Sequence, residues 1–199
     1  MYGDGEWKAY KHGRERKTKW IKVHVWIDAH TGQVCAVEIT DKKVHDSKVV
    51  KDLLKQVDAN IECVVCDGAY DTREVYESIK EHSLNAMVVI PPRKNARIWY
   101  KGAKGKDGYM HPRDENLRLI RKVGRGRWKE IVRYGVRSRV ENVFYRIKRL
   151  FGSSVSGRLY DMQRVELLVW CKALVMMDML YIAGGCICVK ICGYGVSLC

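Results

Sequence analysis

Residues 134–150 carry two side-chain patterns at once, and together they predict one amphipathic helix. Polar residues stand at spacings of three, four and seven, namely Tyr134, Arg137, Glu141 and Lys148. Apolar residues recur at spacings of three and four, namely Val136, Val140, Val143, Ile147 and Leu150. At about 100° per residue, the polar set falls within roughly 60° of one another and the apolar set lies on a different face. Such a helix buries one side and presents a carboxylate flanked by cations and a phenol.

A second feature lies upstream, where the run Cys63-Val64-Val65-Cys66 predicts a short buried strand that leads directly into Asp67-Gly68-Ala69-Tyr70-Asp71. A carboxylate at the carboxyl end of a strand in an α/β sheet lies where ligands usually bind. An Asp-Gly pair is also common in ordinary turns. The cations around Glu141 would likewise suit a solvated, salt-bridged helix surface. The residues alone leave these alternatives open.

Together the two stretches resemble the insertion-sequence DDE transposases, specifically the group with a Tyr-(2)-Arg-(3)-Glu-(6)-Lys signature. Tyr134, Arg137, Glu141 and Lys148 fit every gap of that signature, and residues 67–71 resemble the motif that holds the family's second aspartate. Other segments resemble family landmarks in family order, namely Gly5-Glu6-Trp7, Lys11-His12-Gly13, Pro91-Pro92-Arg93-Lys94-Asn95-Ala96 and Arg137-Ser138. The resemblance covers about residues 2 to 182.

The resemblance implies a ribonuclease-H-like mixed sheet flanked by helices, with three carboxylates that bind two divalent ions, Mg²⁺ or Mn²⁺, at a DNA phosphodiester. Two such ions can hold the attacking and leaving oxygens of an in-line displacement. By resemblance, Asp67 and Glu141 are catalytic acids and metal ligands. Arg137 would hold Glu141 or a phosphate, and Lys148 would contact a phosphate near the transposon end. The implied reaction is cleavage of the transposon end followed by strand transfer.

The chain departs from the family at its first catalytic aspartate. In the family this acid lies in an Asp-Ser-Thr-Gly-like strand just before the Gly-Glu-Trp motif, whereas here only three residues precede Asp4. We therefore expect the first, central strand to be absent between the strands at 19–28 and 61–66, leaving a gap or an improvised pairing and a weakened fold. We expect neither Asp4 nor Asp28 to replace the acid, because Asp28 opens a turn. Metal binding should be weakened, and the chain weakly active or inactive.

The net charge of +14 is unevenly distributed along the chain. Residues 93–149 hold 19 of the 37 lysines and arginines against 5 acids. This distribution predicts a polyanion-binding surface, although a solvated basic surface or RNA binding would also fit. The family resemblance implies double-stranded DNA as the partner. The DNA-contacting candidates are Arg93, Lys94, Arg97, Arg137, Arg146 and Lys148. Trp99, Tyr109 and Trp128 could stack on bases, with core packing expected for at least one of them.

The remaining elements predict a single mixed α/β domain over residues 1–182. Alternating apolar residues indicate a half-buried strand at 19–28 that pairs as a hairpin with 34–40. Further helices are expected at 45–57, 72–82, 113–123 and 165–180, further strands at 61–66 and 86–90, and a loop at 101–109. Gly124-Arg125-Gly126-Arg127 is expected to stop a helix rather than to bind phosphate, because a P-loop needs a preceding strand and a following Lys-Ser/Thr.

Cysteine and apolar residues add two expectations. Residues 183–199 form a cysteine-rich tail that we expect to be irregular, while Cys63 and Cys66 are expected in the core rather than on zinc. No apolar run approaches the 18 or so residues of a membrane span, so we expect a cytoplasmic, nucleoid-associated protein without a membrane partner.

Three functions stay open. The chain could be a truncated transposase, or a non-catalytic DNA-binding fragment that modulates a full-length transposase as a homodimer or by co-assembly. It could also be a different two-metal nuclease of the same fold class.

Overall fold

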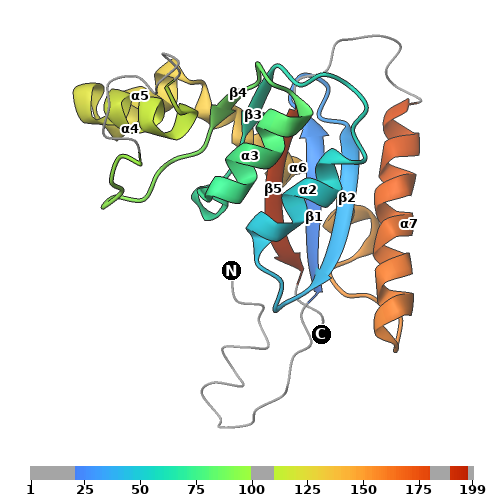
Figure 1. Cartoon of the computed structure of the whole chain (residues 1–199). Coiled ribbons are helices and arrows are strands. Elements are labelled where there is room, and N and C mark those ends of the chain that lie inside the picture. The colour runs from blue at the N-terminus through green and yellow to red at the C-terminus, as the bar shows by residue number, and fades with distance from the viewer. Residues whose placement is uncertain (1–20, 100–109, 180–188, 197–199) are drawn as a thin grey trace, which may run out of the picture.

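Five strands form one mixed sheet in the order β2-β1-β5-β3-β4 (Figure 1). In this computed structural model the described residues are 21–99, 110–179 and, for the backbone alone, 189–196. The strands are β1 (Ile21–Asp28), β2 (Val34–Asp41), β3 (Cys63–Val65), β4 (Met87–Val89) and β5 (Val189–Val196). The α-helices are α2 (Val50–Leu54), α3 (Arg73–His82), α4 (Pro112–Val123), α5 (Arg125–Ile131), α6 (Arg139–Phe151) and α7 (Tyr160–Met179). Short 3₁₀ turns are η1 (Asp46–Val49), η2 (Gly68–Tyr70) and η3 (Tyr134–Ser138).

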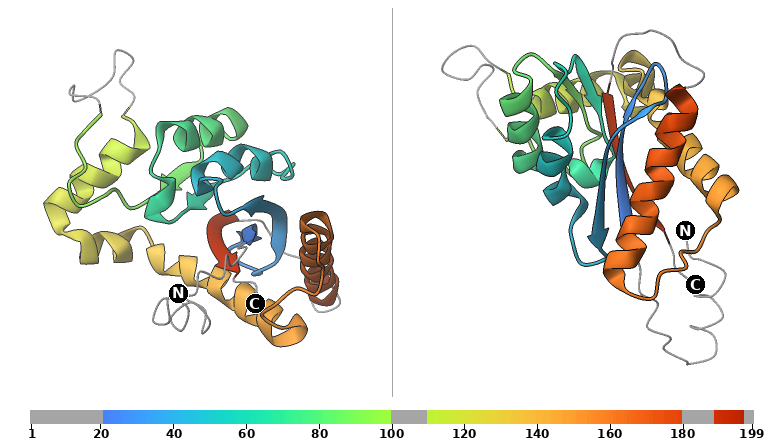
Figure 2. Two further views of the ribbon diagram at one scale, coloured as in Figure 1. Left: turned by 90° about the horizontal axis from the view of Figure 1, so that it is seen from below. Right: turned by 90° about the vertical axis from the view of Figure 1, so that its right-hand side faces the viewer.

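Helices cover both faces of the sheet (Figure 2). One core lies between the sheet and α2 and α3, and it includes Trp26, Leu53 and Ile79. The other core lies between the sheet and α6 and α7, and it includes Val25, Val143 and Leu174. Because both faces are covered, β1 is buried on both sides, which differs from the half-buried strand that its alternating pattern predicts. Helices α4 and α5 extend past the β4 edge of the sheet (Figure 1).

Strand β5 occupies the centre of the sheet, between β1 and β3. It is antiparallel to β1 over the whole of that strand, from Ile21 opposite Val196 to Asp28 opposite Val189. It is parallel to β3 through Val64 and Val65, which face Val189 and Lys190. Without β5, β1 and β3 would each present unpaired backbone N–H and C=O groups inside the sheet. The centre of the sheet is therefore occupied by β5 and shows no gap, and residues 189–196 correct the expectation of an irregular tail.

Most other elements lie within a few residues of their expected positions, and two differ in kind. The segment expected as a helix at 45–57 divides into η1 and α2, and its N-cap is His45, whose side chain accepts the backbone N–H of Ser47. Gly124 ends α4 with a positive φ of 82°, as expected of a helix stop, but α5 begins at the next residue. Among the described residues, no helix combines the length and apolar character that crossing a membrane needs.

The signature segment begins as a 3₁₀ turn and continues as an α-helix. Arg133 has a left-handed conformation with a φ of 51°, which separates α5 from η3. Tyr134 and Arg137 lie in η3, while Glu141 and Lys148 lie on α6. The apolar stripe is buried at Val140, Val143 and Ile147, partly buried at Val136 and half-exposed at Leu150.

Candidate active site

Asp67 lies two residues beyond the end of β3, at the carboxyl edge of the sheet. Its backbone is extended, and its Oδ1 accepts the N–H of Ala69 at 3.4 Å, so that Asp67 caps the short turn η2. Its side chain is 50% exposed and can reach a ligand from solvent. The next residue packs tightly, because a Cβ added at Gly68 would lie 3.1 Å from the carbonyl oxygen of Pro91. A larger residue at this position would have to push the Pro91 carbonyl away by a few tenths of an ångström.

Glu141 lies in the first turn of α6, with a side chain that is 49% exposed. Arg137 connects it to Asp67. One guanidinium nitrogen of Arg137 donates to Oε1 of Glu141 at 3.0 Å, and the other lies 3.6 Å from Oδ2 of Asp67. The tertiary structure thus brings two carboxylates that are 74 positions apart in the sequence to a single cation. A region of excess negative charge is neutralised in part by one arginine.

The other two signature residues are Tyr134 in η3 and Lys148 on α6. The ring of Tyr134 packs against Trp128, with 5.7 Å between the centroids, and Lys129 lies over its face at 5.8 Å. Lys148 lies on α6 seven residues beyond Glu141, which is about two turns along the same helix face. Its side chain is exposed.

Apart from Lys148, the DNA-contacting candidates fall into two groups. Arg93, Lys94 and Arg97 are exposed on the segment that follows β4. Arg137 and Arg146 instead form ion pairs, Arg146 with Asp178 of α7 through two contacts of 2.5 and 3.2 Å. The second group therefore also connects elements of the fold. The indole of Trp128 is fully buried and donates to Asn116 at 3.0 Å, which confirms the expected core role for at least one aromatic residue; Tyr109 lies outside the described residues.

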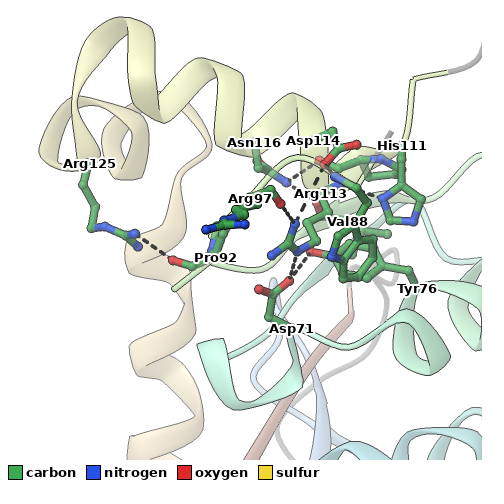
Figure 3. Close-up of polar contacts among 12 residues, drawn as sticks. Asp71, Tyr76, Val88, Pro92, Arg97, His111, Arg113, Asp114, Asn116 and Arg125 are labelled. Atoms are coloured by element: carbon green, nitrogen blue, oxygen red, sulfur yellow. Dashed lines mark hydrogen bonds and ion pairs between the residues drawn. The ribbon is translucent and has the colours of Figure 1, made fainter. Parts of the chain in front are cut away.

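Asp71, the second acid of the 67–71 motif, has a different environment from Asp67 (Figure 3). Its side chain is only 4% exposed, and its Oδ1 lies 2.8 Å from Nε of Arg113, whose side chain is 7% exposed. The hydroxyl of Tyr76 is 3.4 Å from the same oxygen, and burial together with this carboxylate raises the pKa of Tyr76. Sequence reasoning gave Asp71 no individual role and counted Arg113 only among the basic residues of 93–149. A pair 42 positions apart leaves no local pattern that could have revealed the contact.

The donor atoms present suit one divalent ion better than two. Two half-exposed carboxylates offer the oxygen ligands that Mg²⁺ and Mn²⁺ prefer. Across the described ranges, however, no group of three or more His, Cys, Asp or Glu side chains could hold a metal ion. Asp28 is buried and accepts the N–H groups of His30 and Thr31 at 2.6 and 3.3 Å, which is the expected turn role. Asp4, the 5–7 and 11–13 landmarks and the 101–109 loop lie outside the described residues.

Two cysteines precede the candidate site. Cys66 is fully buried in the core and Cys63 is partly buried against other core residues, which agrees with the expected core position of both.

Comparison with known families gives an independent result. A family model described as a transposase DDE domain matches residues 1–176. No solved structure matches the chain. The matched range contains Asp67, the signature residues 134–148 and most of α7, so it covers both segments on which the resemblance depends. The chain therefore belongs to the transposase DDE domain family.

Proposed function

We propose that this chain acts on double-stranded DNA as the catalytic core of an insertion-sequence transposase, with Asp67 and Glu141 as its metal-binding acids. Family membership supports the general function. The observation that carries the assignment of residues is the position of both carboxylates on the guanidinium of Arg137. The arrangement of the sheet supports a ribonuclease-H-like core, since β1 and β2 are antiparallel while β3 and β4 are parallel.

Charge determines how much metal these two acids can hold. Two carboxylates balance the charge of one Mg²⁺, whereas a pair of ions would need further negative ligands. Arg137 adds a positive charge at the same place, which opposes the binding of a divalent ion. A bound ion would polarise a phosphoryl oxygen and supply charge stabilisation. We therefore assign weak metal binding and weak or absent cleavage to the described acids acting alone.

The basic residues have distinct roles in this proposal. Lys148 would contact a phosphate on the face of α6 that also carries Glu141. Arg93, Lys94 and Arg97 would contact the DNA backbone, because they are exposed on the segment that packs beside Asp67. Arg137 would hold Glu141 in place and turn to a phosphate when DNA binds. The site of action would be the cytoplasm at the nucleoid, where this substrate lies.

A second candidate is a non-catalytic DNA-binding protein that modulates a full-length transposase, either as a homodimer or by co-assembly with it. The observation that favours it is the absence, within the described ranges, of a cluster of three acidic, histidine or cysteine ligands. Such a protein would keep the basic surface and lose cleavage.

A nicking assay separates the candidates. The substrate is a duplex with the inverted repeats that flank the coding sequence, and the variants are Glu141→Gln and the matched control Glu130→Gln, an exposed acid on α5. Mg²⁺-dependent nicking that is lost in Glu141→Gln and kept in Glu130→Gln supports the transposase. Salt-sensitive binding without nicking supports the second candidate. Cleavage of RNA in hybrids without strand transfer would contradict both and indicate another two-metal nuclease.

A further inference from the structure

The segment of residues 91–99, here called the basic segment, has no regular secondary structure but is held at several backbone atoms. Three arginines of α4 and α5 donate to its carbonyl oxygens. Arg113 donates to Arg97 at 2.8 Å, Arg125 donates to Pro92 at 2.7 Å, and Arg121 donates to Ala96 at 3.3 Å. Figure 3 shows the contacts of Arg113 and Arg125 at the two ends of the segment. These guanidinium groups face the protein chain, where the sequence alone counted them toward a polyanion-binding surface.

Arg113 makes the most contacts of the three. Its Nε pairs with Asp71 at 2.8 Å, its NH1 group donates to the Arg97 carbonyl, and its guanidinium lies 4.1 Å from the ring centroid of Trp99. The N–H of Trp99 in turn donates to Asp114 at 3.0 Å. Arg113 is 5% exposed as a residue, so it is not available to a phosphate. It connects the 67–71 motif, the basic segment and α4 at a single buried point.

The basic segment also meets the motif near Asp67. The carbonyl oxygen of Pro91 lies so close to Gly68 that a Cβ there would be 3.1 Å away. The segment is therefore held against residues 67–71 at both of its ends. The carbonyls of Pro92, Ala96 and Arg97 accept from arginines of α4 and α5, while the side chains of Arg93, Lys94 and Arg97 are exposed.

We propose that Arg113 is a positioning residue for DNA binding, because it holds the basic segment in a preset geometry beside Asp67. This inference rests on the proposed function, in which Arg93, Lys94 and Arg97 contact the DNA backbone. A segment that is ordered before binding loses less conformational entropy when its cations meet phosphates. Without Arg113, the side chains of Arg93, Lys94 and Arg97 are still present, but the backbone that carries them is no longer held in one position beside Asp67. DNA affinity should then fall although no phosphate-contacting charge has been removed.

A double-mutant cycle tests this inference with a labelled random-sequence duplex, its Kd measured by fluorescence anisotropy over a range of salt concentrations. The first variant is Arg113→Met, which keeps the side-chain length and removes the donors. The second combines Arg93→Ala, Lys94→Ala and Arg97→Ala, and the third joins all four changes. We expect Arg113→Met to raise the Kd about tenfold in the wild-type background, a loss typical of lost preorganisation, and to have no further effect in the triple-substituted background.

Two more variants keep the result interpretable if Arg113→Met folds poorly. Arg125→Ala removes the contact with the Pro92 carbonyl. Its effect on the Kd should also disappear in the triple-substituted background, and in the wild-type background it should be smaller than that of Arg113→Met. Arg113→Lys keeps a positive charge beside Asp71 but lacks the planar guanidinium with its several donors. It should bind DNA more tightly than Arg113→Met and less tightly than the wild type. Arg127→Ala is the matched control, since its side chain is 68% exposed and pairs only locally with Glu130 among the described residues.

Each outcome bears on a different claim. A loss of affinity from Arg113→Met that is equal in both backgrounds overturns the positioning role, as does an unchanged Kd in a folded variant. A triple variant that binds like the wild type overturns the role of the basic segment and leaves the Asp67 and Glu141 assignment to the nicking assay. Wild-type protein without salt-dependent DNA binding would overturn the proposed function itself.

Discussion

Breaking the Arg113–Asp71 ion pair should cost a large part of the stability of this fold. Both side chains are almost fully buried, at 7% and 4% exposure, so Arg113→Met leaves the Asp71 carboxylate without its closest cationic partner in a region of low dielectric. Removing one member of a buried pair typically costs about 3–5 kcal/mol. The free energy of unfolding of a whole protein is only about 5–15 kcal/mol. The expected loss is a large fraction of that total, so the Tm of the variant should be clearly lowered.

The expected shift can be compared with an exposed pair in the same region. For a chain of this length, 1 kcal/mol shifts the Tm by about 2–4 °C, so Arg113→Met should lower the Tm by about 6–20 °C. Arg127→Ala breaks a pair whose side chains are 68% and 65% exposed, and exposed pairs contribute about 0–1 kcal/mol. Thermal unfolding followed by circular dichroism measures both variants.

The double variant Asp71→Asn with Arg113→Met separates the lost pair from other lost contacts. It should recover stability relative to Arg113→Met alone, because no uncompensated carboxylate is then buried. A Tm for Arg113→Met equal to that of Arg127→Ala would refute the reasoning. So would a double variant whose loss is the plain sum of the two single losses, since groups in direct contact should be coupled.

Two further predictions concern the sheet. Ile191→Pro removes a backbone donor from β5 in the centre of the sheet, whereas the matched variant Ile191→Val keeps it. The free energy of unfolding should be about 2 kcal/mol or more lower for Ile191→Pro than for Ile191→Val, and equal urea midpoints would contradict the pairing of β5 with β1. Burial lowers the pKa of His24 from 6.5 to about 4. Between pH 6.5 and pH 4 the unfolded chain therefore binds more protons at this residue than the folded chain does, and the free energy of unfolding falls as the pH drops through this range. The free energy of unfolding should be about 2 kcal/mol lower at pH 5 than at pH 7 from this group, and a His24→Gln variant with the same pH dependence as the wild type would exclude this cause.

Local sequence patterns predicted those strands and helices in which apolar residues repeat with the period of the element. Alternation along residues 21–27 and 34–40 predicted the hairpin, and three- and four-residue spacing predicted α6 and its buried Val140 and Ile147. Such patterns work because side chains repeat every two residues on a strand and every 3.6 on a helix. They do not report whether a second layer covers the other face. The pattern of β1 therefore predicted one buried face, while α2 and α3 bury the other.

Charge counting was the least specific part of the sequence reasoning. The 19 basic residues of the 93–149 region include arginines whose guanidinium groups contact the protein itself. Arg113, Arg121 and Arg125 hold the basic segment, Arg146 pairs with Asp178, and Arg139 donates to the carbonyls of Ala29 and His30. A sequence gives the number of charged side chains. It does not show whether each one faces solvent or a protein group, because the protein groups that these arginines contact lie far away along the chain.

By itself, the sequence determined the family of this protein and identified Asp67 and Glu141 as the two candidate acids, because each acid lies in a short motif with fixed spacing. Only the tertiary structure decided that Asp67 and Glu141 meet at Arg137, that Asp71 is a buried partner of Arg113, and that the backbone of residues 189–196 lies in the middle of the sheet. The physical reason is that each of these arrangements depends on at least one contact between residues 42 or more positions apart, namely Arg137 with Asp67, Asp71 with Arg113, and β5 with β1. Contacts of that range depend on how whole elements pack, and no spacing within one element encodes them.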